Sequence, residues 1–123
     1  MKNAFEVKAP DFNLSPYTGM TKKHYIACAK YLLERAFTHI DSIETPLSFP
    51  PVPGKTYPQP DDPPWRYRSL EFEALERTFT LAGPLMHVDP EITINNIKLK
   101  DYYCLQFYNA FTPGHLNSLP LPE

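Results

Sequence analysis

One stretch of the chain, WRYRSLEFEALERTFTLAGPL, carries most of the side chains whose types could do chemistry. It runs from Trp65 to Leu85 and begins with aromatic and arginine residues, followed by glutamates and a further arginine. Aromatic rings can stack on sugar faces, and an arginine fork can grip a carboxylate through two parallel hydrogen bonds. The pattern therefore favours a binding role, and the candidate binding residues are Tyr57, Trp65, Arg66, Arg68, Glu71, Glu73 and Arg77.

The glutamates of this stretch are candidates for catalytic carboxyl groups. Cleavage of a glycosidic bond needs two carboxyl groups about 5–9 Å apart, on opposite sides of the bond. Residues two apart on a helix point in different directions, so Glu71 and Glu73 do not form such a pair by themselves. Glu73 and Arg77 have the i, i+4 spacing that predicts a structural ion pair. At most one glutamate is then catalytic, and the sequence assigns no catalytic residue.

Common motifs for cofactors and metals do not occur in the sequence. It contains no glycine-rich nucleotide loop, no nucleophile elbow and no zinc-binding helix. The four histidines lack metal-ligand spacing. The adjacent acids Asp61-Asp62 lie in a proline-rich loop, where such residues are usually solvated. The sequence therefore predicts no cofactor and no metal.

Charge and composition narrow the class of protein. The 123 residues carry a formal net charge of −2, and their lysines and arginines are scattered, which argues against nucleic-acid binding. No apolar run suits export or a membrane span. The two cysteines form no CxxC pair and indicate reduced thiols. We therefore expect a cytoplasmic protein without a membrane partner.

The spacing of apolar residues predicts an all-α unit of about three helices. A helix over 22–40 has its apolar residues in one stripe, so its other side faces water. A second helix is expected to begin with Ser69 as its N-cap and to end near Ala82, because Gly83-Pro84 interrupts the pattern. Its apolar residues occupy two flanks, which predicts burial between layers. A third helix covers about 100–111.

The remaining segments divide the chain further. Residues 1–20 form an irregular lead-in, 21–112 a single incomplete helical domain, and 113–123 a tail without a pattern that would close a fold. Within the domain, residues 41–68 hold eight of the 15 prolines. They predict an ordered loop pinned by its aromatic side chains, with a proline-stiffened spacer as the alternative. The pair Asn95-Asn96 predicts a tiny two-stranded turn, since asparagine tolerates the left-handed conformation.

Three segments of the chain resemble the N-terminal part of a bacterial protein family. They are SPYTGMTKKHYIACAKYLLERAF, FPPVPGKTYPQPDDPPWRYRSLEFEALERTFTLAGPL and DPEITINNIKLKDYY. The most specific element is Glu71-x-Glu73-x-x-x-Arg77. The resemblance covers roughly residues 13–111. It is to the family known as domain of unknown function 2264, which overlaps glycoside hydrolase family 154.

The resemblance implies an (α/α) toroid, in which outer and inner helices alternate around a cavity, and β-glucuronidase activity on plant polysaccharides. Family members are several hundred residues long, so the chain resembles only the N-terminal segment of such a ring. Full-length relatives would bind a uronic-acid-containing carbohydrate, whereas the chain alone is expected to be inactive. Whether the chain is itself an enzyme stays open.

Two consequences concern protein partners. Three helices taken from a ring leave apolar faces open, which favours self-association through those faces. The alternative function is a non-enzymatic interaction module, in which the aromatic, proline-rich loop docks a partner protein.

Overall fold

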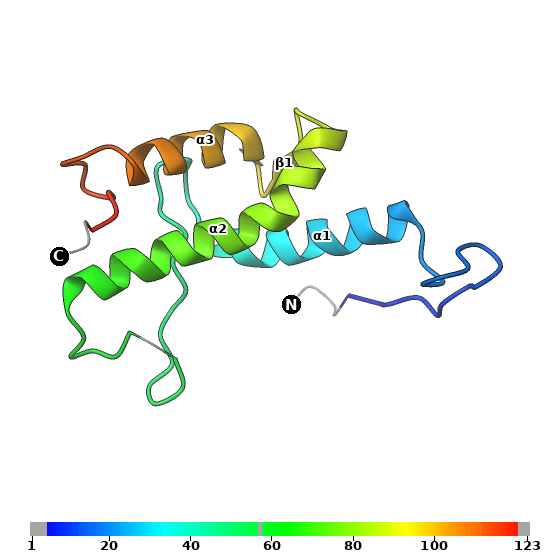
Figure 1. Cartoon of the computed structure of the whole chain (residues 1–123), viewed down its shortest axis with the longest axis horizontal. Coiled ribbons are helices and arrows are strands. Elements are labelled where there is room, and N and C mark those ends of the chain that lie inside the picture. The colour runs from blue at the N-terminus through cyan, green and yellow to red at the C-terminus, as the bar shows by residue number, and fades with distance from the viewer. Residues whose placement is uncertain (1–4, 57, 121–123) are drawn as a thin grey trace.

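The computed structural model describes residues 5–56 and 58–120, which form three helices, a long loop and a small hairpin (Figure 1). The predicted all-α class is confirmed, and one two-stranded hairpin supplies the strands found in this part of the chain. In chain order the elements are α1 (Lys22–Ala36), the 3-10 turn η1 (Phe37–His39), α2 (Pro64–Val88), β1 (Thr93–Ile94), β2 (Ile97–Lys98) and α3 (Leu99–Ala110).

Helix α1 begins with a capping box formed by Thr21 and His24. The backbone N–H of Thr21 donates to Nδ1 of His24 at 3.0 Å, three residues further along. This is the contact that a glutamate makes in an ordinary capping box. A histidine therefore replaces the expected acid, and it satisfies one of the free N–H groups at the start of the helix.

Helix α2 begins five residues before the predicted N-cap, so the prediction of Ser69 as the cap was wrong. Pro64 opens the helix, where its missing N–H costs nothing and its fixed φ suits the first turn. Ser69 lies inside the helix, and its hydroxyl donates to the carbonyl oxygen of Trp65 at 3.1 Å. The long loop consequently ends at Pro63 rather than at residue 68.

The predicted end of α2 near Ala82 was also wrong, because the helix continues through Pro84 to Val88. Leu85 explains the continuation, since it is 3% exposed and belongs to the core. Its burial outweighs the local cost of a proline, which removes one hydrogen bond and bends a helix. Figure 1 shows the last turns of α2 leaving the direction of its first part.

Helix α2 packs on two flanks, as the sequence predicted. One flank carries Leu81 and Leu85 and faces α1, while the other carries Phe72 and Phe79 and faces α3. Figure 1 shows α2 running between the other two helices. Closure of such layers into a toroid stays a prediction.

The hairpin between α2 and α3 confirms the predicted asparagine turn. Thr93 pairs with Lys98 and Ile94 with Ile97, in antiparallel register. Asn95 and Asn96 have φ values of +49° and +65°, which a two-residue hairpin turn of this hand requires. The Asn95 side chain also donates to the carbonyl of Glu34, and this bond ties the hairpin to α1.

The loop over residues 41–63 is held in part by an apolar side chain that the sequence analysis did not select. Phe49 and Val52 are 41% and 47% exposed. Leu47 is 1% exposed and is the buried anchor. Of the predicted aromatic anchors, Phe49 meets the His39 ring edge-on with 6.0 Å between the centroids, and Tyr57 lies outside the described residues. Leu47 therefore adds an anchor to those that were predicted.

The core lies where the end of α1, the middle of α2, the hairpin and the first half of α3 meet. Its largest fully buried side chains are Tyr102, Tyr103, Phe37, Leu33, Leu47 and Leu99. The hydroxyl of Tyr103 donates to the Thr78 hydroxyl at 2.8 Å, so this buried polar group keeps a partner.

Candidate functional site

The predicted binding residues do not gather at one site. Tyr57 lies outside the described residues. The other six lie on α2, where they separate into three places along and around the helix. These are Trp65 with Arg66, Arg68 with Glu71, and Glu73 with Arg77.

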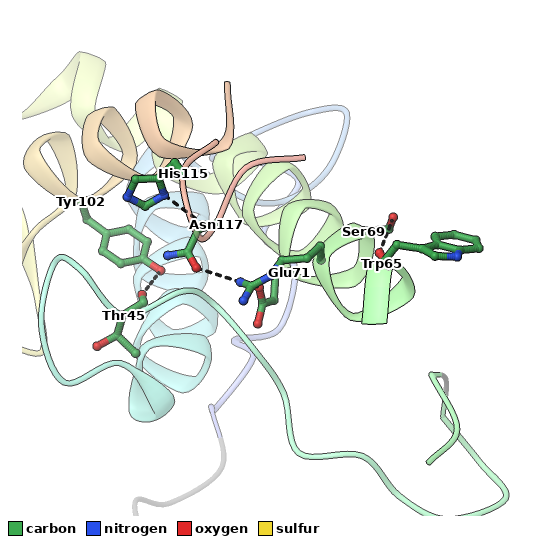
Figure 2. A network of polar contacts seen from close by, with 8 residues as sticks. Thr45, Trp65, Ser69, Glu71, Tyr102, His115 and Asn117 are labelled. Atoms are coloured by element: carbon green, nitrogen blue, oxygen red, sulfur yellow. Dashed lines mark hydrogen bonds and ion pairs between the residues drawn. The ribbon is translucent and has the colours of Figure 1, made fainter. Parts of the chain in front are cut away.

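Arg68 and Glu71 form the best enclosed of the three places. Nη1 of Arg68 donates to a Glu71 carboxylate oxygen at 2.7 Å, and these residues are one helical turn apart. The same nitrogen donates to Oδ1 of Asn117 at 2.8 Å. Figure 2 shows Asn117 reaching from the C-terminal segment toward this pair, while Trp65 points away from it. One arginine therefore joins α2 to a segment 49 residues further along the chain.

A small pocket lies beside this pair, where α2, α3 and the long loop meet. Its volume is about 20 Å³, which is room for a single water molecule. Leu47 and Leu75 contribute apolar wall, and Gln106 and Asn117 contribute polar wall. The pocket is thus too small for a sugar in this conformation.

Burial controls the ionisation of Glu71. Desolvation raises the pKa of the Glu71 carboxyl above its ordinary value of 4.5, although the charge and hydrogen bond of Arg68 oppose that shift. The folded chain holds this proton more tightly than the unfolded chain does. The contribution of the Glu71 carboxyl to the free energy of unfolding therefore falls as the pH rises from about 4.5 through the raised pKa.

We expect Glu71→Gln to remove this pH dependence. Glutamine keeps a carbonyl oxygen for Arg68 but carries no charge to desolvate. The melting temperature of the variant minus that of the wild type should therefore rise between pH 4 and pH 7. Ser69→Ala lies on the same helix and changes no titratable group. It is the control for a change with pH in the melting-temperature difference that does not come from Glu71. A difference that is constant or falls across this range would contradict the raised pKa.

Glu73 and Arg77 form the predicted i, i+4 ion pair, with 2.6 Å between Oε1 and Nη2. The Arg77 side chain is 75% exposed, so the pair lies at the surface and contributes little to stability. Glu71 and Glu73 have different arginine partners, which confirms that they diverge. They do not face one another across a pocket.

Trp65 and Arg66 lie in the first turns of α2. The guanidinium carbon of Arg66 is 5.5 Å from the Trp65 ring centroid, and Arg66 also pairs with Asp62 at 2.9 Å. Trp65 is 53% exposed. The ring has surface on which a sugar could stack, but Arg66 already has two partners.

Sequence reasoning missed the polar residues that complete the Arg68 site. Asn117 comes from the segment that was expected to be a patternless tail. Gln106 is 5% exposed and was not selected, because a single glutamine within an apolar helix carries no periodic signal. Only their positions in the folded chain bring them beside Arg68.

A much larger apolar groove lies between α1 and α2. Its volume is about 530 Å³. Pro84 of α2 lines this groove, together with residues of α1 from Lys22 to Leu32. Tyr25 and Leu32 on α1 and Val88 on α2 remain 54%, 46% and 47% exposed. The predicted open helix face is therefore present on the described chain.

Comparison with known protein families, with curated proteins and with solved structures finds no match for the chain. Residues 5–56 and 58–120 contain no cluster of three or more histidine, cysteine or acidic residues that could hold a metal ion. None of the helices described for this chain is long and apolar enough to cross a membrane.

Proposed function

We propose that the chain is an N-terminal helical segment of a carbohydrate-active (α/α) toroid, of the kind that its sequence resembles, and that it does not hydrolyse glycosides alone. The two-sided packing of α2 carries the proposal. In a toroid, an outer helix has one side in water, whereas an inner helix packs against both outer and inner neighbours beside the cavity. The open groove beside α1 is where a further helix of the ring would pack.

The inactivity of the isolated chain follows from its carboxyl groups. Hydrolysis needs two of them about 5–9 Å apart with the sugar between. In the pocket beside Arg68, the carboxylate is that of Glu71, and Glu73 is paired elsewhere with Arg77. Further helices would have to supply the second carboxyl group and the remaining walls of a sugar-sized cavity.

The proposed ligand of a full-length relative is a uronic-acid-containing carbohydrate. Arg68 is the candidate for holding its carboxylate, because a guanidinium binds carboxylates strongly in a partly buried site. Trp65 offers an exposed ring on which a neighbouring sugar of a polysaccharide could stack. These residues would bind the substrate, and none of them is assigned to bond cleavage.

An assay with a chromogenic β-glucuronide tests the proposal. The purified 123-residue chain should show no turnover above buffer, whereas a full-length family relative should cleave the substrate. In that relative, replacing the arginine that matches Arg68 with methionine should raise KM more than it lowers kcat. Robust turnover by the short chain, abolished by Glu71→Gln, would overturn the proposal.

A protein-interaction module is the second candidate function. It is favoured by the exposure of Phe49 and Val52 on a loop whose base is buried through Leu47. A monomer with a sharp thermal transition would favour this function, because such a chain needs no further helices. Self-association that Leu32→Glu abolishes and Tyr17→Glu leaves unchanged would favour the toroid segment, since Leu32 lines the groove and Tyr17 does not.

A further inference from the structure

The chain turns back on itself after α3. Residues 112–119, which we call the lid, leave the end of α3 through Pro113-Gly114, and Gly114 has a φ of +78°. Further along, the backbone N–H of Leu119 donates to the carbonyl of Ala110 at 2.9 Å. The lid therefore returns to the last turn of the helix it has just left.

The centre of the lid is fixed by Asn117. Its side-chain oxygen accepts from Arg68 at 2.8 Å, and its backbone N–H donates to Nδ1 of His115 at 3.0 Å. The first bond reaches across to α2, and the second shapes the lid itself. Asn117 is thus the residue through which the lid is attached to α2 (Figure 2).

The attachment is polar rather than apolar. Leu116 is 80% exposed, and Asn117 and Leu119 are only half-buried. The apolar core of the molecule contains no residue of the lid. A segment with few buried apolar contacts opens at a lower free energy than the core does. Opening of the lid consequently does not require unfolding of the helices.

We propose that residues 112–119 form a reversible lid over the pocket between α2 and α3, and that the Arg68–Asn117 hydrogen bond holds the lid closed. The closed lid supplies one wall of the pocket and occupies a donor group of Arg68. The open lid widens the pocket toward Glu71 and Phe72 and frees that donor for an anionic group. The lid goes beyond the proposed function and does not depend on it, because it rests on contacts within the chain.

Hydrogen exchange of backbone amides tests the lid. Asn117→Ala removes the hydrogen bond to Arg68. A hydrogen bond to a charged partner stabilises the closed lid by enough to change the equilibrium between closed and open lid about tenfold or more. The amides of Ser118 and Leu119 both donate to backbone carbonyls in the closed lid. They should therefore exchange at least about tenfold faster in the variant, while the amide of Leu33 in the core of α1 keeps its rate.

Leu116→Ala is the matched control, because Leu116 lies in the lid but is largely exposed. It should leave the exchange of Ser118 and Leu119 unchanged. Unchanged exchange of these two amides in Asn117→Ala would show that the Arg68–Asn117 hydrogen bond does not hold the lid closed. Equal acceleration of the lid and of Leu33 would show that the segment unfolds with the whole chain, and this result also overturns the lid.

Discussion

Replacing Phe37 with alanine is expected to lower the free energy of unfolding by about 3–5 kcal/mol, the range typical of a large aromatic removed from a core. The side chain is 1% exposed. Its ring centroid lies 5.0 Å from that of Tyr102 and 6.2 Å from that of Tyr103, so it joins η1, which directly follows α1, to α3. The total free energy of unfolding of such a domain is about 5–15 kcal/mol, so the variant loses a large share of its stability.

Equilibrium unfolding in urea, followed by far-ultraviolet circular dichroism, measures this loss. Phe12→Ala is the control, because Phe12 is 61% exposed and its removal should change stability by less than about 0.5 kcal/mol. If the two variants unfold at the same urea concentration, Phe37 is not the link between η1 and α3 that its ring contacts indicate.

The parts of the fold that the sequence predicted are those set by local pattern. Two apolar flanks on one helix require two neighbours, and α2 has them in α1 and α3. Asn95-Asn96 is a local signal of the same kind, since each residue tolerates the left-handed backbone that the turn needs. In these places the local preference and the tertiary packing agree.

The bounds of α2 were missed at both ends, at the start because one local signal outweighs another and at the end because tertiary packing outweighs a local signal. Ser69 is a good N-cap, but the adjacent prolines Pro63-Pro64 start the helix earlier at no cost in hydrogen bonds. Gly83-Pro84 normally stops a helix, yet the burial of Leu85 against the core holds the next turn in place. The early start is thus marked by the prolines at the boundary itself, whereas the late end depends on burial that no residue near Pro84 reveals.

The candidate site divides in the same way. The i, i+3 spacing of Arg68 and Glu71 and the i, i+4 spacing of Glu73 and Arg77 decide which arginine each glutamate meets. Asn117 is 49 residues from Arg68 in sequence, and its arrival depends on the turn at Gly114. Asn117 reaches Arg68 only because the chain turns back after α3. A contact of this kind leaves no periodic pattern in the sequence, which is why Asn117 was not predicted.

The double variant Tyr102→Phe/Gln106→Leu is expected to detach the base of the long loop while α3 stays folded. The Tyr102 hydroxyl donates to the carbonyl of Thr45 at 3.0 Å, and Nε2 of Gln106 donates to the carbonyl of Ile43 at 2.7 Å. Each carbonyl left without a partner costs about 1–3 kcal/mol while it remains buried. Moving the segment into water removes that cost, so detachment is the lower-energy response.

Cleavage after Glu44 by a glutamate-specific protease measures the detachment, because that bond lies between the two tethered carbonyls. The double variant should be cut at least about tenfold faster than the wild type, which corresponds to about 1.4 kcal/mol. Its global stability should fall by less than the sum of the two single variants, since the released carbonyls bind water. Tyr108→Phe, at a 70% exposed position of α3, is the control. Cleavage no faster than in that control would mean that these two hydrogen bonds do not hold the base of the loop.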